Sequence, residues 1–505
     1  MSDFNKIDDN TPILIGAGQA VQRDAGETSP MQLAALASQA AIKDCGAPAI
    51  AGQIDTICVT KLFSDMGHLW PCKWGRSDNP PQSVASRIGA NPSSRIYTQT
   101  GGNEPQSRLI EFAADIARGE RSVVLLTGSE ALKNQRRAER DGLTPDWSEH
   151  FDEPLEDRGF GDMVATSQEL ANGLMNVIYY YALVEEAQRQ KFGRSVDEHR
   201  AAMAQLLESF SRVAVENPYA QFPDMRTAQD IVDAPSMTHL YTTSMIARDG
   251  VNQAAALLLC SVGKARELGI DESQWVFLHG MAEGRELELT HRDDPAVSPM
   301  AGKVAEQALA MAQLDMDDIG SLDIYSCFPC AVTTVATQLG LPTDGSHSLT
   351  TTGGLPYFGG PGNNYSMHAL VEAVHWARQQ PEGYAMVTSN GGVLSKHGSG
   401  IFSHKVSSID WGTQGTKVSN ASLKRRSVAA DPGTGIIVSY TVHFDRDQSA
   451  HAIIIGETEA GERFVACTAP EDLTTAVKML EQDPTGHAVT VAAPVEERIH
   501  FTLAQ

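Results

Sequence analysis

The chain has 505 residues, of which 42% are hydrophobic and 20% charged, a composition typical of a globular protein built from several structural units. Its formal net charge of -24 argues against nucleic acid or an anionic membrane surface as a partner, because Coulomb forces would repel both. No stretch approaches the roughly 20 apolar residues of a membrane span, and 7 scattered cysteines fit a reducing compartment without disulfides, so we expect a cytoplasmic protein.

The first part of the chain alternates buried strands with helices. Residues 12–21 (PILIGAGQAV) read as a strand, and they lack the third glycine and the immediate helix of a dinucleotide fingerprint. Ser29 and Pro30 then begin a helix as N-cap and first-turn proline. This alternation predicts a mainly parallel sheet covered on both faces. The other predicted elements here are strands at residues 54–60, 95–98 and 122–127 and helices at residues 82–89 and 104–118.

The sequence changes in character between residues 131 and 243, which are more charged and carry long helical patterns at residues 172–190 and 196–215. We predict a helical insertion that sits over the sheet. Residues 250–269 return to a buried strand and a helix, which would complete the first half. The second half resumes the alternation, with strands at residues 275–284, 322–327 and 384–389 and helices at residues 300–314, 329–339 and 364–378.

A basic and polar linker at residues 423–432 precedes a short all-β pattern. Four short strands and one helix, at residues 435–444, 452–458, 463–467, 489–501 and 471–481, predict a small barrel. We therefore divide the chain into four units. These are an N-terminal half (residues 1–130 and 244–270), a helical insertion (131–243), a C-terminal half (271–420) and an additional β-barrel domain (421–505).

Two stretches of the first half recur in the second half in the same order. Residues 29–60 and 298–330 both open on Ser-Pro-Met, continue as an Ala-rich helix and end in a strand. Residues 101–132 and 362–394 form a second matching pair. Because each pair is a helix leading into a buried strand, we interpret the chain as a duplicated α/β unit.

The phrases RSVVLLTGSEAL, LDIYSCF and TSMIARDGVNQAAALLLCSVGKARELGI resemble the thiolase superfamily, closest to the sterol-carrier-protein type. The similarity covers about residues 11–407, and with the additional domain the whole chain resembles the thiolase-like proteins of type 1. The resemblance implies duplicated αβαβα halves, an OB-like C-terminal barrel, acyl-CoA substrates and Claisen chemistry. Thiolases are usually dimers, but an additional domain could block that contact, so a monomer and a homodimer both remain open.

The resemblance also places the catalytic groups of thiolases on particular residues. The nucleophilic cysteine falls at Gly102, the histidine of the Gly-His-Pro loop at Gly360, and the second cysteine at Ser389. Glycine cannot attack a thioester, so no acyl-enzyme would form. The fourth motif is altered, because Tyr325 and Cys327 stand where relatives carry Asn-Glu-Ala-Phe or His-Asp-Cys-Phe. These replacements predict the absence of ordinary thiolase activity.

Several polar residues would still face one crevice at the strand ends, where open α/β sheets bind ligands. Helix capping is the alternative interpretation for the asparagines, a packed position for His368, and simple hydrogen bonding for Ser389. Cys327, Tyr325 and His368 are the candidate catalytic groups. The candidate pocket residues are Gly102, Asn103, Gly360, Asn363, Asn364 and Ser389.

Cys327 carries three interpretations. It ends a buried strand just before a helix, so the positive helix end could lower the pKa of its thiol and make it a replacement nucleophile. With Cys330 it also forms a Cys-x-x-Cys sequence of the redox type. The third interpretation is a structural thiol, because cysteine is often buried. The sequence predicts no metal site, since no second Cys or His pair lies at ligand spacing.

The glycine-rich stretch at residues 353–362 either lets backbone approach a phosphate or pantetheine, or forms a turn that lines the crevice. Two classes of function follow. In the first, the protein binds an acyl-CoA or another acyl thioester, with no further cofactor, and transfers or presents the acyl group. In the second, it is a non-catalytic scaffold that contacts partners through its C-terminal barrel, and a redox protein is a more distant third.

Overall fold

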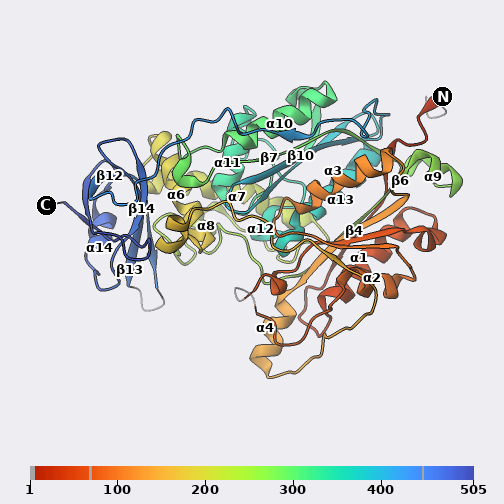
Figure 1. The fold of residues 1–505 in the computed structure, drawn as a ribbon, viewed down its shortest axis with the longest axis horizontal. Helices are drawn as coiled ribbons and strands as arrows, with labels where there is room; N and C mark the ends of the chain where they lie inside the picture. Colours follow the sequence, from red (N-terminus) through yellow and green to blue (C-terminus); the bar gives the residue numbers. More distant parts are fainter. Residues whose placement is uncertain (1–5, 68–70, 446–448, 505) are drawn as a thin grey trace.

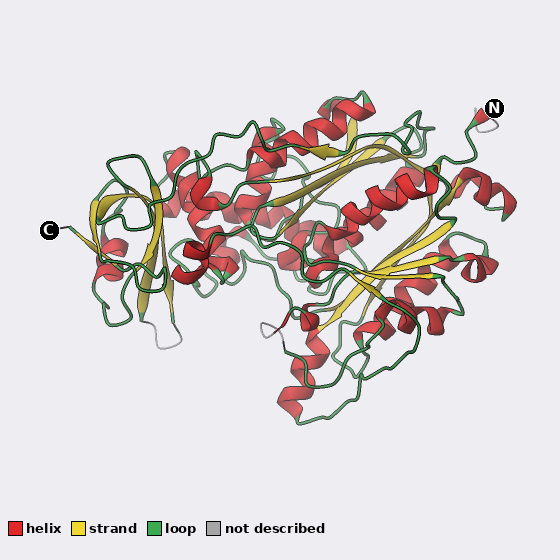
Figure 2. Ribbon diagram, viewed as in Figure 1, coloured by secondary structure: helices red, strands yellow, loops and turns green. Residues whose placement is uncertain are grey.

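The computed structural model describes residues 6–67, 71–445 and 449–504. A large α/β body is joined to a smaller β-rich unit at the C-terminal end (Figure 1). Helices lie on the outer sides of the strands and also between them (Figure 2). Among the described residues, no helix combines the length and the apolar character needed to cross a membrane.

An 11-stranded sheet runs through the body in the order β5-β3-β2-β4-β6-β1-β7-β10-β9-β8, with β11 beside β7. The sheet has two matching parts that meet where β1 lies beside β7. Outward from that junction the strands are β1, β6, β4 and β2 on one side and β7, β10, β9 and β8 on the other, so in each part the first strand of the half is followed by its last strand. A duplicated α/β unit requires this arrangement. The strands are β1 (Pro12–Val21), β2 (Thr56–Val59), β3 (Ser94–Tyr97), β4 (Val123–Ala131), β5 (Glu156–Asp157), β6 (Asn252–Ser261), β7 (Val276–Arg285), β8 (Ile319–Asp323), β9 (Tyr384–Gly391), β10 (Lys396–Ser403) and β11 (Lys417–Val418).

The sheet is mixed, so the prediction of a mainly parallel sheet is wrong. β2 pairs in parallel with β3 and β4, but β6 is antiparallel to both β4 and β1, and β10 is antiparallel to β7 and β9. β10 runs antiparallel to β9 because the connection between the two strands is short. β9 ends at Gly391 and β10 begins at Lys396, and so short a turn joins only antiparallel neighbours. β10 was not predicted because its sequence, KHGSGIFS, contains no apolar run, although the whole strand is buried.

Helices cover the sheet on its outer sides and form a layer between its two parts. Leu33 of α1 and Val84 of α2 share a buried cluster with Ile57 of β2. Phe112 of α3 and Leu370 of α13 share another with residues of β4, β6, β7, β9 and β10, so this pair of helices contacts both parts of the sheet (Figure 1). The helices of the body are α1 (Pro30–Asp44), α2 (Pro80–Ile88), α3 (Glu104–Ala117), α4 (Leu132–Asp141), α9 (Val262–Glu267), α10 (Pro299–Ala312), α11 (Pro329–Gln338), α12 (Gly354–Tyr357) and α13 (Tyr365–Gln379).

The two long helices predicted for residues 131–243 are confirmed as α6 (Val177–Lys191) and α7 (Val196–Glu216). The first begins five residues later than predicted because Gly173, with φ at 97°, ends the π-helical turn Leu170–Leu174. Asn176 then caps α6 by accepting a hydrogen bond from the Ile178 amide. Two short helices, α5 (Ser167–Glu169) and α8 (Ala228–Val232), complete this region.

The C-terminal unit is a five-stranded antiparallel sheet in the order β14-β13-β12-β15-β16, with the helix α14 (Thr475–Glu481). The strand predicted at residues 489–501 is two strands, because Glu496 and Glu497 adopt left-handed backbone conformations between them. A single bridge between Cys467 and His500 links β14 to the residue before β16, so the barrel remains a prediction. The strands are β12 (Thr434–Phe444), β13 (Ala450–Glu457), β14 (Arg463–Cys467), β15 (Ala488–Val491) and β16 (Phe501–Leu503).

Candidate functional site

Gly102 lies two residues before α3, and a tyrosine occupies the space that a side chain there would need. A Cβ atom built on Gly102 would lie 2.3 Å from the Tyr325 hydroxyl oxygen and 2.5 Å from the Asn390 carbonyl oxygen. Real Cβ atoms essentially never approach another heavy atom within 3.0 Å. Position 102 therefore accepts only glycine as long as Tyr325 keeps its place.

Tyr325 lies just beyond the end of β8, which runs from Ile319 to Asp323, so the strand predicted at residues 322–327 is placed too late in the chain. Its backbone amide donates a hydrogen bond to the Thr388 hydroxyl at 3.2 Å, and its ring meets Tyr365 edge-to-face at 5.2 Å. The residue is 7% exposed. Burial raises the pKa of the Tyr325 phenol well above its ordinary value, so the hydroxyl is protonated at neutral pH and can donate a hydrogen bond.

The environment of Cys327 contradicts the expected activation of its thiol. Burial raises the pKa of Cys327 to about 11, and the opposing hydrogen bonds from Tyr181 and Asn390 are smaller effects. Asn390 Nδ2 lies 3.7 Å from the Cys327 sulfur. Although α11 begins at Pro329, its positive end does not outweigh the removal of the thiolate from water. The lowered pKa predicted for this thiol is therefore wrong.

Cys330 has a separate set of partners from Cys327. Its sulfur lies 3.4 Å from the Tyr241 hydroxyl, and its amide donates to Glu185 Oε2 at 2.8 Å. The carboxylate of Glu185 in turn contacts His199 at 2.8 Å. Both Cys327 and Cys330 are free and buried. In the described part of the chain, no group of His, Cys, Asp and Glu side chains could hold a metal ion.

Ser389 and Asn103 take part in hydrogen bonding near the start of α3. The Ser389 hydroxyl donates to Gln106 Oε1 at 2.5 Å, as its simpler interpretation predicted. Asn103 precedes α3 but makes no side-chain cap, so the capping interpretation is wrong for it. Its backbone is already helical, with φ at -80° and ψ at -18°, whereas a capping residue is extended. Its Nδ2 donates to Ser107 at 3.2 Å, and its Oδ1 is buried without a hydrogen-bond partner.

Asn363 and Asn364 join the two halves of the fold instead of capping α13. Asn363 accepts from the Gly101 amide at 2.9 Å and donates to the Lys61 carbonyl at 2.7 Å. Asn364 donates to the Gly128 carbonyl at 2.8 Å, and neither asparagine makes a side-chain cap. The sequence could not distinguish helix capping from hydrogen bonding between the two halves, because an asparagine after a glycine is compatible with both roles.

His368 occupies a packed position in α13. It is fully buried, its Nδ1 lies 2.6 Å from Gln19 Oε1 on β1, and its ring meets Phe358 at 5.0 Å. Burial lowers the pKa of His368 to about 3, so the ring is neutral at physiological pH. The partners of His368 come from β1 and from residue 358, whereas those of Tyr325 and Cys327 come from β9, α6 and α13. His368 therefore shares none of these direct partners with the other two candidate catalytic residues.

The glycine-rich stretch is a packed turn. Every residue from 352 to 364 is buried, which does not fit a loop that offers its backbone to a phosphate in solvent. A Cβ atom on Gly360 would meet no atom closer than the Arg248 carbonyl oxygen at 3.3 Å. Position 360 therefore has nearly enough room for a side chain, in contrast to position 102.

Sequence reasoning missed Tyr181 and Asn390. The Tyr181 hydroxyl accepts from Asn390 Nδ2 at 2.8 Å and from the Leu394 amide at 2.9 Å, and its ring stacks on Phe328 at 4.2 Å. Tyr181 comes from α6, so the insertion supplies one side of this site. The only signal for Asn390 was its place directly after Ser389. We call the cluster Gly102, Tyr181, Tyr325, Cys327 and Asn390 the Gly102 site.

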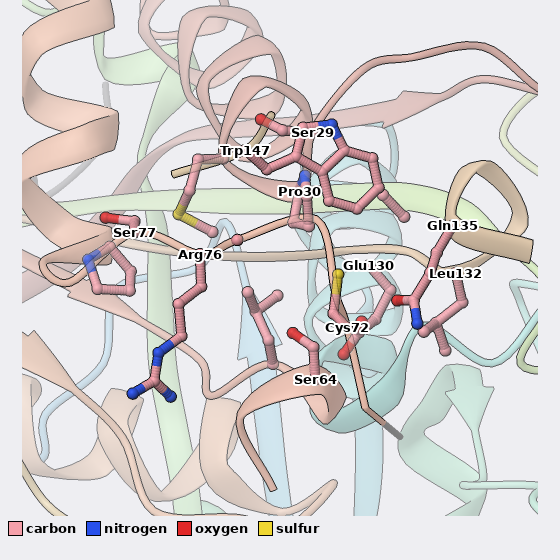
Figure 3. A pocket seen from close by; sticks show the side chains of 15 residues that line it. Ser29, Pro30, Ser64, Cys72, Arg76, Ser77, Glu130, Leu132, Gln135 and Trp147 are labelled. Carbon is pink, nitrogen blue, oxygen red and sulfur yellow. The ribbon is translucent and has the colours of Figure 1, made fainter. Parts of the chain in front are cut away.

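A small cavity lies apart from the Gly102 site, at the start of α1 (Figure 3). It measures about 20 Å³, room for about one water molecule. Glu130, Cys72 and Trp147 are among its lining residues. Burial raises the pKa of Glu130 to about 8, and its Oε1 accepts a hydrogen bond from the Phe63 amide at 2.7 Å. The buried carboxyl is therefore protonated over much of the neutral range.

Comparison with known proteins gives a match over nearly the whole length of both chains. The crystal structure of a monomeric SCP2-thiolase like protein type 1 from Mycobacterium smegmatis is 36% identical, covers 99% of this chain and 100% of its own, and superposes with a TM-score of 0.83. Residues 417–494 match the family model for the additional C-terminal domain of thiolase-like protein type 1. A search of curated proteins gives no match.

Two thiolase structures share the fold at low identity. Human mitochondrial 3-ketoacyl-CoA thiolase is 15% identical and covers 79% of this chain and 99% of its own, with a TM-score of 0.56. The acetyl-CoA acetyltransferase from Syntrophomonas wolfei is 17% identical and covers 79% and 100%, also with a TM-score of 0.56. At this identity the two matches describe the fold alone.

Proposed function

This chain belongs to the thiolase-like protein type 1 family, and on that premise we propose that it binds an acyl-CoA or a related acyl thioester without forming an acyl-enzyme. The observation that carries the proposal is the position of Tyr325, whose hydroxyl takes the space of a side chain on Gly102. A thiolase nucleophile at this position would have to share that space. The covalent route therefore has neither the sulfur nor the room that it needs.

The groups that remain in the Gly102 site suit binding better than bond formation. The Tyr325 phenol is protonated and can donate to a thioester carbonyl oxygen. The Cys327 thiol, with its pKa raised to about 11, is protonated at neutral pH and so is a weak nucleophile. The Tyr325 hydroxyl and the Cys327 thiol are both neutral, so they can hydrogen-bond to the carbonyl of a bound thioester without reacting with it. We therefore propose that the protein holds or presents an acyl group.

We also propose that the protein is a monomer. The short strand β5 covers part of β3 at this end of the sheet by parallel pairing through Ile96–Glu156 and Tyr97–Asp157, which leaves less of β3 open to a second chain. Arg158 fixes β5 by two hydrogen bonds of 2.7 Å to the Glu111 carboxylate on α3. The relative from Mycobacterium smegmatis is likewise described as monomeric.

A second candidate function is a scaffold that contacts a partner through the C-terminal unit. It is favoured by three apolar side chains at helical spacing on and before α14. Leu473, Val477 and Leu480 are 52%, 44% and 43% exposed and lie at i, i+4 and i+7. Exposed apolar stripes of this kind mark protein contact surfaces.

Thermal unfolding in the presence of CoA and of acyl-CoAs of increasing chain length separates the two candidates. A ligand at 100 times its dissociation constant stabilises the folded state by about 2.7 kcal/mol. We expect the melting temperature to rise with acyl-CoA and the rise to be smaller in Tyr325→Phe, which lacks the hydroxyl donor. Tyr384→Phe, at the opposite end of β9 from Asn390, is the matched control. No shift at any chain length would remove the acyl thioester proposal and leave the scaffold.

A further inference from the structure

A cavity of about 270 Å³ lies between the helical insertion and the C-terminal unit. None of its lining residues belongs to the Gly102 site. β12 and β13 contact α6, and the C-terminal unit lies at the end of the molecule away from α3 (Figure 1). We call this space the junction cavity. Its lining residues are Asn172, Gly173 and Tyr179 from the insertion and His443, Asp445, His451, Ala452, Ile453, Cys467, Thr468, Pro470, Arg498 and His500 from the C-terminal unit.

The sheet forms one wall of the junction cavity, and titratable side chains on this wall stand beside apolar ones. His443 of β12 is directly opposite His451 of β13, and Ile453 is opposite Cys467 of β14. Because side chains alternate along a strand, these four point to the same face of the sheet. The His443 ring lies 5.9 Å from His451 and stacks at 4.0 Å on Tyr179 of the insertion. Ring stacking of this kind fixes the position of the insertion over this face.

Cys467 is the reactive group of the junction cavity. Its sulfur lies 3.7 Å from His500 Nδ1 and 3.7 Å from Asn172 Oδ1. The same His500 nitrogen lies 3.4 Å from the Cys467 carbonyl oxygen, a contact that is a hydrogen bond only in the tautomer with the hydrogen on Nδ1. Cys467 is partly exposed, like Cys72 and unlike the other cysteines, which are buried. Burial raises the pKa of the Cys467 thiol and the positive charge of Arg498 opposes that shift, so reaction at neutral pH requires a nearby base.

We propose that Cys467 is a modification site, at which it forms a mixed disulfide with a low-molecular-weight thiol that carries a carboxylate. The neighbouring imidazole of His500 supplies the base. The exposed guanidinium of Arg498, which donates through Nε to the Ala171 carbonyl at 3.0 Å, has further N–H groups with which to bind the carboxylate.

The oxidant in this reaction is the disulfide of the small thiol. In the His500 tautomer that carries its hydrogen on Nε2, Nδ1 accepts the thiol proton, and the Cys467 sulfur attacks one sulfur of the incoming disulfide. A new sulfur–sulfur bond forms at Cys467 and the incoming one breaks. The departing thiolate takes the proton from His500 and leaves as a free thiol. Cys467 is oxidised, one equivalent of the small thiol is released in reduced form, and excess free thiol reverses the step.

Cys72 provides an internal comparison for this reactivity. It is the other partly exposed cysteine among the described residues, and it lines the cavity of Figure 3. Burial is the largest cause that raises the pKa of its thiol, and the negative charges of Glu139 and Asp65 add to it. These negative charges also repel an anionic disulfide, so Cys72 reacts more slowly than Cys467 with such a reagent.

The test is to incubate the full-length protein with oxidised glutathione, which carries carboxylates, and separately with cystamine, which is cationic. The modified cysteine is identified by peptide mapping over time. We expect oxidised glutathione to modify Cys467 first, at several times the rate of Cys72, and reduced glutathione to reverse the modification. Modification of Cys72 ahead of Cys467 in the wild-type protein would overturn the proposal, and this comparison needs no variant.

Three variants separate the roles of the residues. Cys467→Ser should abolish the modification, and His500→Gln should slow it about tenfold or more with either reagent. Arg498→Gln should slow the reaction with oxidised glutathione more than the reaction with cystamine, because it removes the partner of the carboxylate as well as the charge that opposes the raised pKa of Cys467. An unchanged rate in His500→Gln, or an equal loss with both reagents in Arg498→Gln, would contradict the assigned roles.

Discussion

The hydroxyl oxygen of Tyr325 lies 2.3 Å from the position that a Cβ atom on Gly102 would occupy. The two residues are 223 positions apart in the chain, one before α3 and the other after β8. Their packing links the identity of one position to that of the other. A small residue at 102 permits a large residue at 325, and a side chain at 102 requires the tyrosine to move.

Gly102→Cys alone should destabilise the protein. The added side chain meets the Tyr325 hydroxyl and the Asn390 carbonyl oxygen, and overpacking of this kind costs about 1–3 kcal/mol. Chemical denaturation measures the change in the free energy of unfolding. Gly360→Ala is the control, because a Cβ there comes no closer than 3.3 Å to another atom. A Gly102→Cys protein as stable as the wild type would show that Tyr325 moves aside freely.

The double variant Gly102→Cys, Tyr325→Asn tests the coupling directly. Removing the phenol relieves the overlap with Tyr325 but not the one with the Asn390 carbonyl oxygen, so the two substitutions together should cost less than the sum of their separate effects but more than Tyr325→Asn alone. Because the residues are in contact, we expect a coupling free energy of about 1–3 kcal/mol. Additive effects would mean that the two side chains do not compete for the same space.

The sequence predicted the alternation of strands and helices, the long insertion helices and the position of Gly102, because each depends on local pattern or on motif similarity. It did not predict that Tyr325 fills the space beside Gly102, since this depends on how two distant strand ends meet. The prediction of a lowered pKa for the Cys327 thiol was wrong for a related reason. A helix start is visible in the sequence, but the burial that raises the pKa of the Cys327 thiol depends on how distant elements pack around it, and the hydrogen bonds from Tyr181 and Asn390 only partly oppose that rise.

Cys327 should resist alkylation in the folded protein. With its pKa raised to about 11, the thiolate fraction at pH 7 is on the order of 10⁻⁴ even before limited access is considered. Labelling with iodoacetamide, followed by peptide mapping, should find Cys72 and Cys467 modified and Cys327 unmodified at neutral pH. Labelling in denaturant controls for reagent and digestion. Rapid modification of Cys327 in the folded state would restore it as a candidate nucleophile.

Glu130 should make the protein less stable as pH rises. Its pKa is raised from 4.5 to about 8 in the folded state, so the folded protein binds the proton more tightly than the unfolded chain. Stability from this group is therefore complete below about pH 4.5 and is lost as pH rises towards 8. The shift corresponds to at most about 5 kcal/mol over that window.

Glu130→Gln replaces the protonated carboxyl by a neutral amide and should flatten this part of the pH dependence. Unfolding free energies measured between pH 5 and pH 9 should show a larger gain for the variant at the alkaline end. Glu272→Gln, at an exposed position, is the control. Parallel pH curves for Glu130→Gln and the wild type would contradict a raised pKa at this residue.

Arg158→Ala should expose the edge of the sheet at β3. The substitution removes both hydrogen bonds to Glu111 and with them one of the charge pairs that hold β5 beside β3, while the Lys61–Asp157 pair remains. An uncovered edge strand offers unpaired backbone groups to another chain, so we expect self-association that increases with protein concentration. Analytical ultracentrifugation measures this directly. Arg140→Ala, which removes only an exposed pair with Asp141, should leave the mass unchanged. If Arg158→Ala remains a monomer at every concentration, β5 is not what keeps two copies of this sheet apart.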